Sequence, residues 1–277
     1  MNGETLRRLQ QTELGILLEV DEFCRRHGIQ YSLYVGTALG AVRHGGFIPW
    51  DDDMDIAMTR ENFNRFCARW REQPIEGLFL QNAATDITCG INHTKIRKDN
   101  TCFLSAGAAP NRTHAGIWID ILVWDKVPDA KMGTLYIYWN LIRSFAFSRG
   151  FALNSTENRA RHIAKRILRM IPESCCVRQM RRSTRNFQRY AGRQSDYSWM
   201  CLSCLQTIRK GERFPAHIAK DYAEIAFEGV PLMIFADYGR MLEIAYGDYM
   251  RLPPVEQRVC SHNPERIEFE QRMEESV

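Results

Sequence analysis

A helical repeat of apolar residues opens the chain. Leu6, Leu9, Ile16, Leu17, Val20, Phe23 and Cys24 recur every three or four residues, and the acid Glu13 falls on the same stripe. This spacing places them on one face of a helix. Gly28 then suits the end of the helix, because glycine readily adopts the backbone conformation that terminates one. The pattern predicts an amphipathic helix over roughly residues 6–28.

Alternating and turn-forming segments follow this helix. Residues 29–35 alternate and are rich in Tyr and Val, which predicts a strand. Gly36 and Thr37 form the expected turn, and residues 38–43 a short helix closed by two glycines. Residues 54–58 predict a second strand, and Thr59 is a good N-cap for a helix running to about Arg71.

The remainder divides into a strand-rich and a helix-rich part. Residues 78–80, 93–97 and 116–124 predict strands, separated by a loop at 105–115. Residues 134–190 are helical in pattern, with a break at Pro172, and residues 196–260 mix short elements. We therefore expect an α/β (α+β) core over residues 1–130 and a helical, basic region over 131–277 that packs back onto it.

Composition and charge narrow the class of protein. The 277 residues are 45% hydrophobic and 25% charged, which is ordinary for a globular protein. No apolar run reaches the length of a membrane span, and the N-terminus does not resemble a signal peptide, so a cytoplasmic protein is expected. The nine cysteines are then expected as free thiols. Cys201 and Cys204 form a CxxC pair, but half a zinc motif is a weak signal.

One segment is strongly cationic. Residues 159–193 hold eleven Lys or Arg and one acid, against a net charge of +4 for the whole chain. Such a block attracts anionic lipid, nucleic acid or polyphosphate, although a solvated helical surface explains it equally. Contact with an anionic membrane on the cytosolic side is one expectation from it.

An acidic run supplies the clearest chemical signal. Asp51, Asp52, Asp53 and Asp55 lie within five residues and are flanked by apolar residues on both sides. If the strand extends that far, Asp51, Asp53 and Asp55 share one face. Oxygen ligands of this kind favour Mg²⁺ or Mn²⁺. The alternative is a solvated acidic turn, which the apolar flanks disfavour.

A further acid comes from a later strand. Asp120 is the one charged residue in the apolar run of residues 117–123, and a buried carboxylate needs a partner. A metal shared with Asp53 and Asp55 satisfies that need, as does a salt bridge to Lys95 or Arg97. Upstream, Gly36 and Thr37 stand before a helix, where backbone N–H groups can seat a phosphate. A strand, Gly-Thr, a helix and then Asp-x-Asp on the next strand resembles the layout of the nucleotidyltransferase superfamily.

One segment resembles a particular family. Residues 34–56, with the sequence YVGTALGAVRHGGFIPWDDDMDI, closely resemble the signature of the LicD family, which includes the fukutin-related proteins. The segment Trp118-Ile119-Asp120-Ile121 and the tail segment Tyr246-Gly247-Asp248-Tyr249-Met250 are similar to further family motifs. The resemblance covers residues 5–125 well and residues 227–263 loosely.

The resemblance implies a nucleotidyltransferase-like mixed sheet and an activity. The activity is transfer of a phospho-alcohol, such as phosphocholine or a phospho-alditol, from a CDP-activated donor to a glycan hydroxyl, with release of CMP. The acceptor would be a cell-surface or lipid-linked glycan, such as lipopolysaccharide or teichoic acid. Metal-binding acids carry over to Asp53 and Asp55, with Asp51 a lesser candidate and Asp120 a further ligand or a base. Substrate-binding residues would be Gly36, Thr37, Arg43, His44, Lys95 and Arg97.

Two other functions fit parts of the sequence. The same acids serve an enzyme that transfers a nucleoside monophosphate to a protein, small molecule or RNA and releases pyrophosphate. A non-catalytic polyanion-binding module would use the basic segment, but this function leaves the acidic run unexplained. The acids also repel a nucleic-acid backbone, so no DNA partner is expected.

Tyr31, Tyr34 and Trp50 could form a cage for a quaternary ammonium by cation–π contact, or serve as core.

Overall fold

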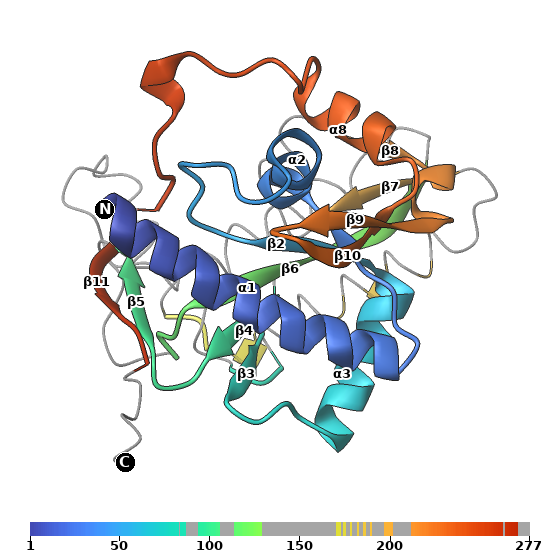
Figure 1. Ribbon diagram of the computed structural model, residues 1–277. Helices are drawn as coiled ribbons and strands as arrows, with labels where there is room; N and C mark the ends of the chain where they lie inside the picture. The colour runs from blue at the N-terminus through green and yellow to red at the C-terminus, as the bar shows by residue number, and fades with distance from the viewer. Residues whose placement is uncertain are drawn as a thin grey trace.

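The structure is a computed structural model of the chain. It describes residues 1–82, 84–86, 94–105, 114–128, 170–172, 197–201, 212–262 and 264–270, with isolated residues between 174 and 189. Figure 1 shows a curled central sheet with helices against it and the C-terminal part of the chain returning around it. This mixed arrangement is the α+β class that the sequence pattern predicts.

The central sheet is mixed in strand direction. Its main order is β1 (Ser32–Leu33), β2 (Asp55–Thr59), β6 (Trp118–Pro128), β4 (Thr94–Lys98) and β3 (Leu78–Gln81). β2 and β6 run parallel, whereas the other neighbours on this path are antiparallel. The far half of β6 also pairs with β7 (Tyr197–Cys201), which in turn pairs with β8 (Phe214–Pro215).

Three N-terminal helices pack on this sheet. α1 (Gly3–Arg26) crosses β4 and β6 and buries the apolar stripe that the sequence predicts. α2 (Val35–His44) ends at Gly45, whose φ of 71° is the left-handed conformation expected of a glycine cap. α3 (Arg60–Glu72) begins at Thr59, whose side chain accepts a hydrogen bond from Asn62 N, which confirms the predicted N-cap.

The C-terminal part contributes two small sheets and a helix. β9 (Tyr222–Phe227) and β10 (Val230–Phe235) form an antiparallel pair beside β1. η1 (Ala216–Ala219) precedes this pair and α8 (Tyr238–Tyr246) follows it. Beyond α8 the chain arches over the top of the molecule in Figure 1 and includes η2 (Val255–Gln257). It ends in β11 (Pro264–Glu268), which pairs with β5 (Cys102–Ser105).

The structure corrects two local predictions. The strand expected over residues 29–35 is only two residues long, and α2 begins at Val35, so Gly36 and Thr37 lie in the first turn of a helix. The second strand begins at Asp55, and Asp51 and Asp53 therefore lie in a loop. The strand-face argument for Asp51, Asp53 and Asp55 is wrong, because the extended alternation on which it depends starts only at Asp55.

Several expectations lie outside the described residues. These are the helical pattern of residues 134–169, most of the basic segment, and Cys204 of the CxxC pair. Cys24, Cys67, Cys102, Cys175, Cys201 and Cys260 are free thiols. Within the described ranges, no helix combines the length and the apolar character needed to span a membrane.

Candidate active site

Two parallel strands bring acids from distant parts of the chain together. The pairing of β2 with β6 places Asp55 opposite Asp120, and Asp120 N donates to Met54 O over 2.8 Å. Thr37 Oγ1 accepts a hydrogen bond of 2.8 Å from Asp55 N, so the start of α2 is tied to the start of β2. Backbone pairing therefore sets the spacing of these two carboxylates.

The loop before β2 is held in place from two sides. Gln10 of α1 donates from Nε2 to Asp51 O over 2.9 Å, and Asp51 N bonds to Ile48 O. The Asp51 carboxylate lies directly against Gly36, where a Cβ would come within 2.5 Å of Asp51 Oδ2. Gly36 therefore admits the acid to the start of α2, where free backbone N–H groups gather.

Asp52 holds the C-terminal segment against the acidic run. Its side chain is fully buried and accepts from Ser261 N and His262 N, each over 2.9 Å. His262 Nδ1 lies 3.3 Å from Asp52 Oδ1. The middle acid of the run thus anchors a segment more than 200 residues away, which the sequence alone does not indicate.

Crowding makes the acids hard to ionise. Burial, and then the charges of Asp53 and Asp52, raise the pKa of Asp51 to about 8. Burial is also the main reason that the pKa values of Asp53 and Asp55 are raised, with neighbouring acids adding to it at Asp55. Like charges held this close favour a positive ion between them.

Glu13 of α1 belongs to the same cluster. Its side chain is 3% exposed, and among the described residues its Oε2 has no hydrogen-bond partner. Burial raises its pKa well above the usual value, followed by the charges of Asp53, Asp52, Asp51 and Asp55. In the sequence, Glu13 is a single acid on the apolar stripe of the first helix. Its position on that buried face was the one indication that it could belong to the site.

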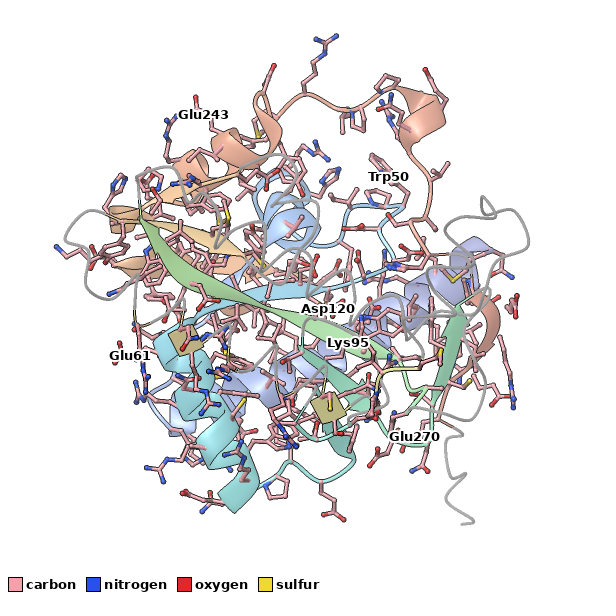
Figure 2. All side chains as sticks on the ribbon, turned by 180° about the vertical axis from the view of Figure 1, so that it is seen from behind. Trp50, Glu61, Lys95, Asp120, Glu243 and Glu270 are labelled. Carbon is pink, nitrogen blue, oxygen red and sulfur yellow. The ribbon has the colours of Figure 1, made fainter. Side chains whose placement is uncertain are left out.

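Asp120 forms the salt bridge that the sequence offered as one of two alternatives. Lys95 Nζ lies 2.8 Å from Asp120 Oδ2, and both side chains are about 10% exposed. Trp118 Nε1 donates to the same oxygen over 3.0 Å, and Lys95 Nζ lies 4.1 Å from the Trp118 ring centre. Figure 2 shows Lys95 and Asp120 side by side on their strands. Burial lowers the pKa of Lys95, which its ion pair opposes.

The two other predicted cations lie in different surroundings. Arg97 is buried and donates to Gln81 Oε1 and Gly116 O. Arg43 donates from Nη1 to Tyr249 O over 3.0 Å and to Arg251 O over 3.3 Å, and it lines a pocket. His44 is exposed beside it, with its ring centre 6.3 Å from that of Trp50.

A pocket of about 670 Å³ opens beside Asp51. One wall comes from α2 and the following loop, and the other from the segment after α8. The charged and aromatic residues that line it are Arg43, Trp50, Asp51, Tyr246, Asp248, Tyr249, Arg251 and Arg258. The Arg258 guanidinium lies 5.5 Å from the Trp50 ring centre. The pocket thus combines cationic and aromatic groups next to the acids.

Of the two alternatives that the sequence left open for Tyr31, Tyr34 and Trp50, core packing holds for the first two. Tyr31 is fully buried, with its hydroxyl 2.7 Å from Asp21 Oδ1. Tyr34 is also buried and packs edge-on against Trp124 in the core. Only Trp50 faces the pocket, where Tyr246 and Tyr249 join it. Those two come from the tail segment, which folds back through tertiary contacts.

The donor set suits a hard divalent cation. The charges of Asp51, Asp53, Asp55 and Asp120 act on one another, and Lys95 and His262 are near enough to oppose part of that negative charge. The buried and unpartnered Glu13 oxygen faces the same charges. Carboxylate oxygens in this number are the ligands that Mg²⁺ and Mn²⁺ prefer. The residues present therefore fit such an ion.

The mixed sheet flanked by helices, with Asp55 and Asp120 on neighbouring parallel strands, is consistent with the nucleotidyltransferase-like class of α+β folds. A family model described as the LicD/FKTN/FKRP nucleotidyltransferase domain matches residues 28–132. The chain is 30% identical over 274 residues to the lipopolysaccharide cholinephosphotransferase LicD of Haemophilus influenzae, across 95% of this chain and 97% of that protein. The chain belongs to the LicD family.

Two further matches cover only a short part of the chain. Two uncharacterised proteins, from Rickettsia prowazekii and Rickettsia typhi, are each 43% identical to this chain over 47 residues. Those matches span 17% of this chain and 18% or 15% of the other proteins. The similarity to the H. influenzae protein extends over the C-terminal segment.

Proposed function

We propose that this protein is a phosphotransferase that moves phosphocholine from CDP-choline to a hydroxyl of a lipopolysaccharide glycan and releases CMP. The observation that carries the proposal is the end-to-end similarity to the H. influenzae cholinephosphotransferase, with the acids of β2 and β6 side by side beside a cationic and aromatic pocket. Both features are needed, since the acids alone serve many phosphate chemistries.

The chain's own residues divide the work of the reaction. The start of α2 presents backbone N–H groups from the turn that contains Gly36, which suits phosphate oxygens. Arg43 and Arg258 in the pocket supply positive charge for the diphosphate. Trp50, Tyr246 and Tyr249 give faces on which a quaternary ammonium or a base can rest.

Asp120 holds one of two roles in this scheme. It either completes the acidic site with Asp53 and Asp55, or accepts the proton of the attacking glycan hydroxyl. Its ion pair with Lys95 places a positive charge 2.8 Å from one carboxylate oxygen. Lys95 therefore acts here by setting the orientation of Asp120.

Asp53, Asp55 and Asp120 would hold a Mg²⁺ or Mn²⁺ ion, with Asp51 beside them. Such an ion, when bound, neutralises charge that develops on the leaving phosphate. The remaining contribution of the protein is to orient donor and acceptor in line and to exclude water from the pocket.

The basic segment, residues 159–193, is proposed to contact anionic lipid near the acceptor.

The test is a screen of CDP-choline, CDP-ethanolamine, CDP-glycerol and CDP-ribitol with purified protein, lipopolysaccharide and Mg²⁺. We expect CMP release to be fastest with CDP-choline and to stop in EDTA. Release of pyrophosphate from a nucleoside triphosphate, without CMP release from any CDP-alcohol, would instead establish the nucleotidyltransferase alternative. The absence of both products with every donor would contradict a catalytic role.

A further inference from the structure

The C-terminal strap, which comprises residues 260–262 and β11, closes over one end of the acidic site. β11 pairs with β5, and Arg8 of α1 stacks on Phe269 just beyond the strap at 4.3 Å. Asp52 receives the backbone N–H groups of Ser261 and His262 on its two oxygens. The strap is therefore fixed at both ends of its short span.

This anchoring places His262 among the site residues. Its Nδ1 lies 3.3 Å from Asp52 Oδ1, and its ring packs edge-on against Trp118, with ring centres 5.7 Å apart. Trp118 is the same residue that bonds to Asp120. Ligand atoms of Asp52, Asp53 and His262 all lie within 4.8 Å of one another. His262 thus stands next to Asp53 without being part of the acidic run.

The hydrogen bond that the His262 ring makes through Nδ1 leaves its Nε2 for a ligand. In the described part of the chain, the hydrogen bonds of His262 are made by its backbone N and by Nδ1, and both go to Asp52. The side chain is 32% exposed, so it is open to a bound molecule. Asp52 has both oxygens occupied by the strap, which makes it an orienting group for the imidazole rather than a free ligand.

We propose that His262 is a substrate-contacting residue, held by Asp52 through Nδ1 so that Nε2 meets the diphosphate of the bound donor. The inference rests on the proposed function for the identity of the donor, CDP-choline. The surroundings suit an anion at this point, because the Lys95 ammonium and the His262 ring both lie within electrostatic reach of Asp53.

A set of variants separates this role from a purely structural one. His262→Gln keeps a polar atom near the Nε2 position, His262→Asn keeps one near Nδ1, and His262→Ala keeps neither. The matched control is Val259→Ala, a change at an exposed residue just before the strap. For each protein we would measure kcat and KM for CDP-choline, together with Tm.

Contact with the donor and a purely structural role predict opposite rankings of the activities of His262→Asn and His262→Gln. If Nε2 contacts the donor, His262→Ala and His262→Asn lose on the order of 10- to 100-fold in kcat/KM, which is typical of a lost hydrogen bond to a charged group, while His262→Gln loses less. If His262 merely fastens the strap to Asp52, His262→Asn resembles the wild type and His262→Gln is the damaged variant. The second order would overturn the proposal.

A binding measurement makes the inference independent of turnover. The ring nitrogens of His262 can be followed by ¹⁵N NMR, assigned with His262→Gln, while inorganic pyrophosphate and Mg²⁺ are added. We expect the Nε2 signal to move at saturation, whereas an unmoved Nε2 signal would refute the contact. Wild-type protein that releases no CMP from any CDP-alcohol but still shows this shift would refute only the proposed activity.

Discussion

The four carboxylates of the acidic run, residues 51–55, make different contacts. Asp52 is a structural acceptor for the strap, Asp51 lies against Gly36, and Asp55 is paired in register with Asp120. The same residue type therefore serves anchoring and chemistry within five positions. Which acid does which depends on the direction each side chain takes where the loop enters β2.

Replacing Asp53 by Asn tests the chemical role of the cluster. We expect CMP release to fall by about 10²–10³-fold or more, because the change removes one charge from the proposed cation site. Tm should not fall, since the change relieves repulsion among the acids. Glu61→Gln, at an exposed position in the first turn of α3, is the matched control. Full activity of Asp53→Asn would remove Asp53 from the mechanism.

The raised pKa values predict how stability depends on pH. Folding raises the pKa of Asp51 from the ordinary 3.8 to about 8. Between these pH values the folded state therefore keeps a proton that the unfolded state releases. In EDTA, the contribution of Asp51 to the free energy of unfolding should therefore be fully present below about pH 4 and be lost as the pH rises to about 8. Denaturant titrations across this range would measure it.

Glu13→Gln provides the control for that pH dependence. The pKa of Glu13 is also raised, chiefly by burial, and an amide at that position cannot ionise. We expect the variant to show a shallower fall of stability with pH and to match or exceed the wild type at pH 8. An unchanged slope would show that Glu13 does not contribute to the effect.

At the scale of elements, the approach of α2 to the acidic loop depends on two glycines. A Cβ at Gly36 would meet the Asp51 side chain, whereas a Cβ at Gly40 would meet the backbone oxygen of Gly46. A side chain can move aside more easily than a backbone. The two positions on one helix therefore separate an effect on the site from an effect on the fold.

Gly36→Ala is expected to impair activity more than stability. The displaced Asp51 carboxylate should lower kcat/KM at least about 10-fold, because misplaced site groups are costly. Gly40→Ala should instead lower the free energy of unfolding by about 1–3 kcal/mol, as overpacking does. Kinetics and denaturant unfolding of both variants would measure the contrast, and equal loss of stability in the two would contradict it.

The pairing of β4 with β6 brings Lys95 opposite Asp120, and this pair is buried. Lys95→Met should cost about 3–5 kcal/mol of stability, because it leaves a buried carboxylate without its cation. The double variant Lys95→Met/Asp120→Asn should regain most of that loss, since both charges are then removed. Thermal unfolding would compare the three proteins. A single variant as stable as wild type would show that Lys95 is not needed to hold Asp120.

At the scale of the whole molecule, the C-terminal return completes a site whose acids come from the first half of the chain. Asp52→Ala removes the acceptor of two strap N–H groups and should destabilise the strap by about 1–3 kcal/mol. Hydrogen exchange should accelerate at β11 and β5, and not at β9 and β10. Uniform acceleration would indicate a general loss of stability instead.

Local patterns sufficed for several parts of this structure. The apolar stripe of α1, the Thr59 cap and the strand around Asp120 follow from side-chain periodicity and capping chemistry, which act over a few residues. The start of α2 at Val35 did not follow. Thr37 binds Asp55 N from another element, and such a contact is not present in the local sequence.

By itself, the sequence determined the α+β class, the acidic run and the family to which the chain belongs, because these depend on residue types at short spacing. Tertiary structure alone decided that Asp52 anchors the strap, that Glu13 joins the acids, and that Tyr246 and Tyr249 replace Tyr31 and Tyr34 beside the pocket. Those outcomes depend on contacts between residues far apart in the chain, and only the folded backbone sets such distances.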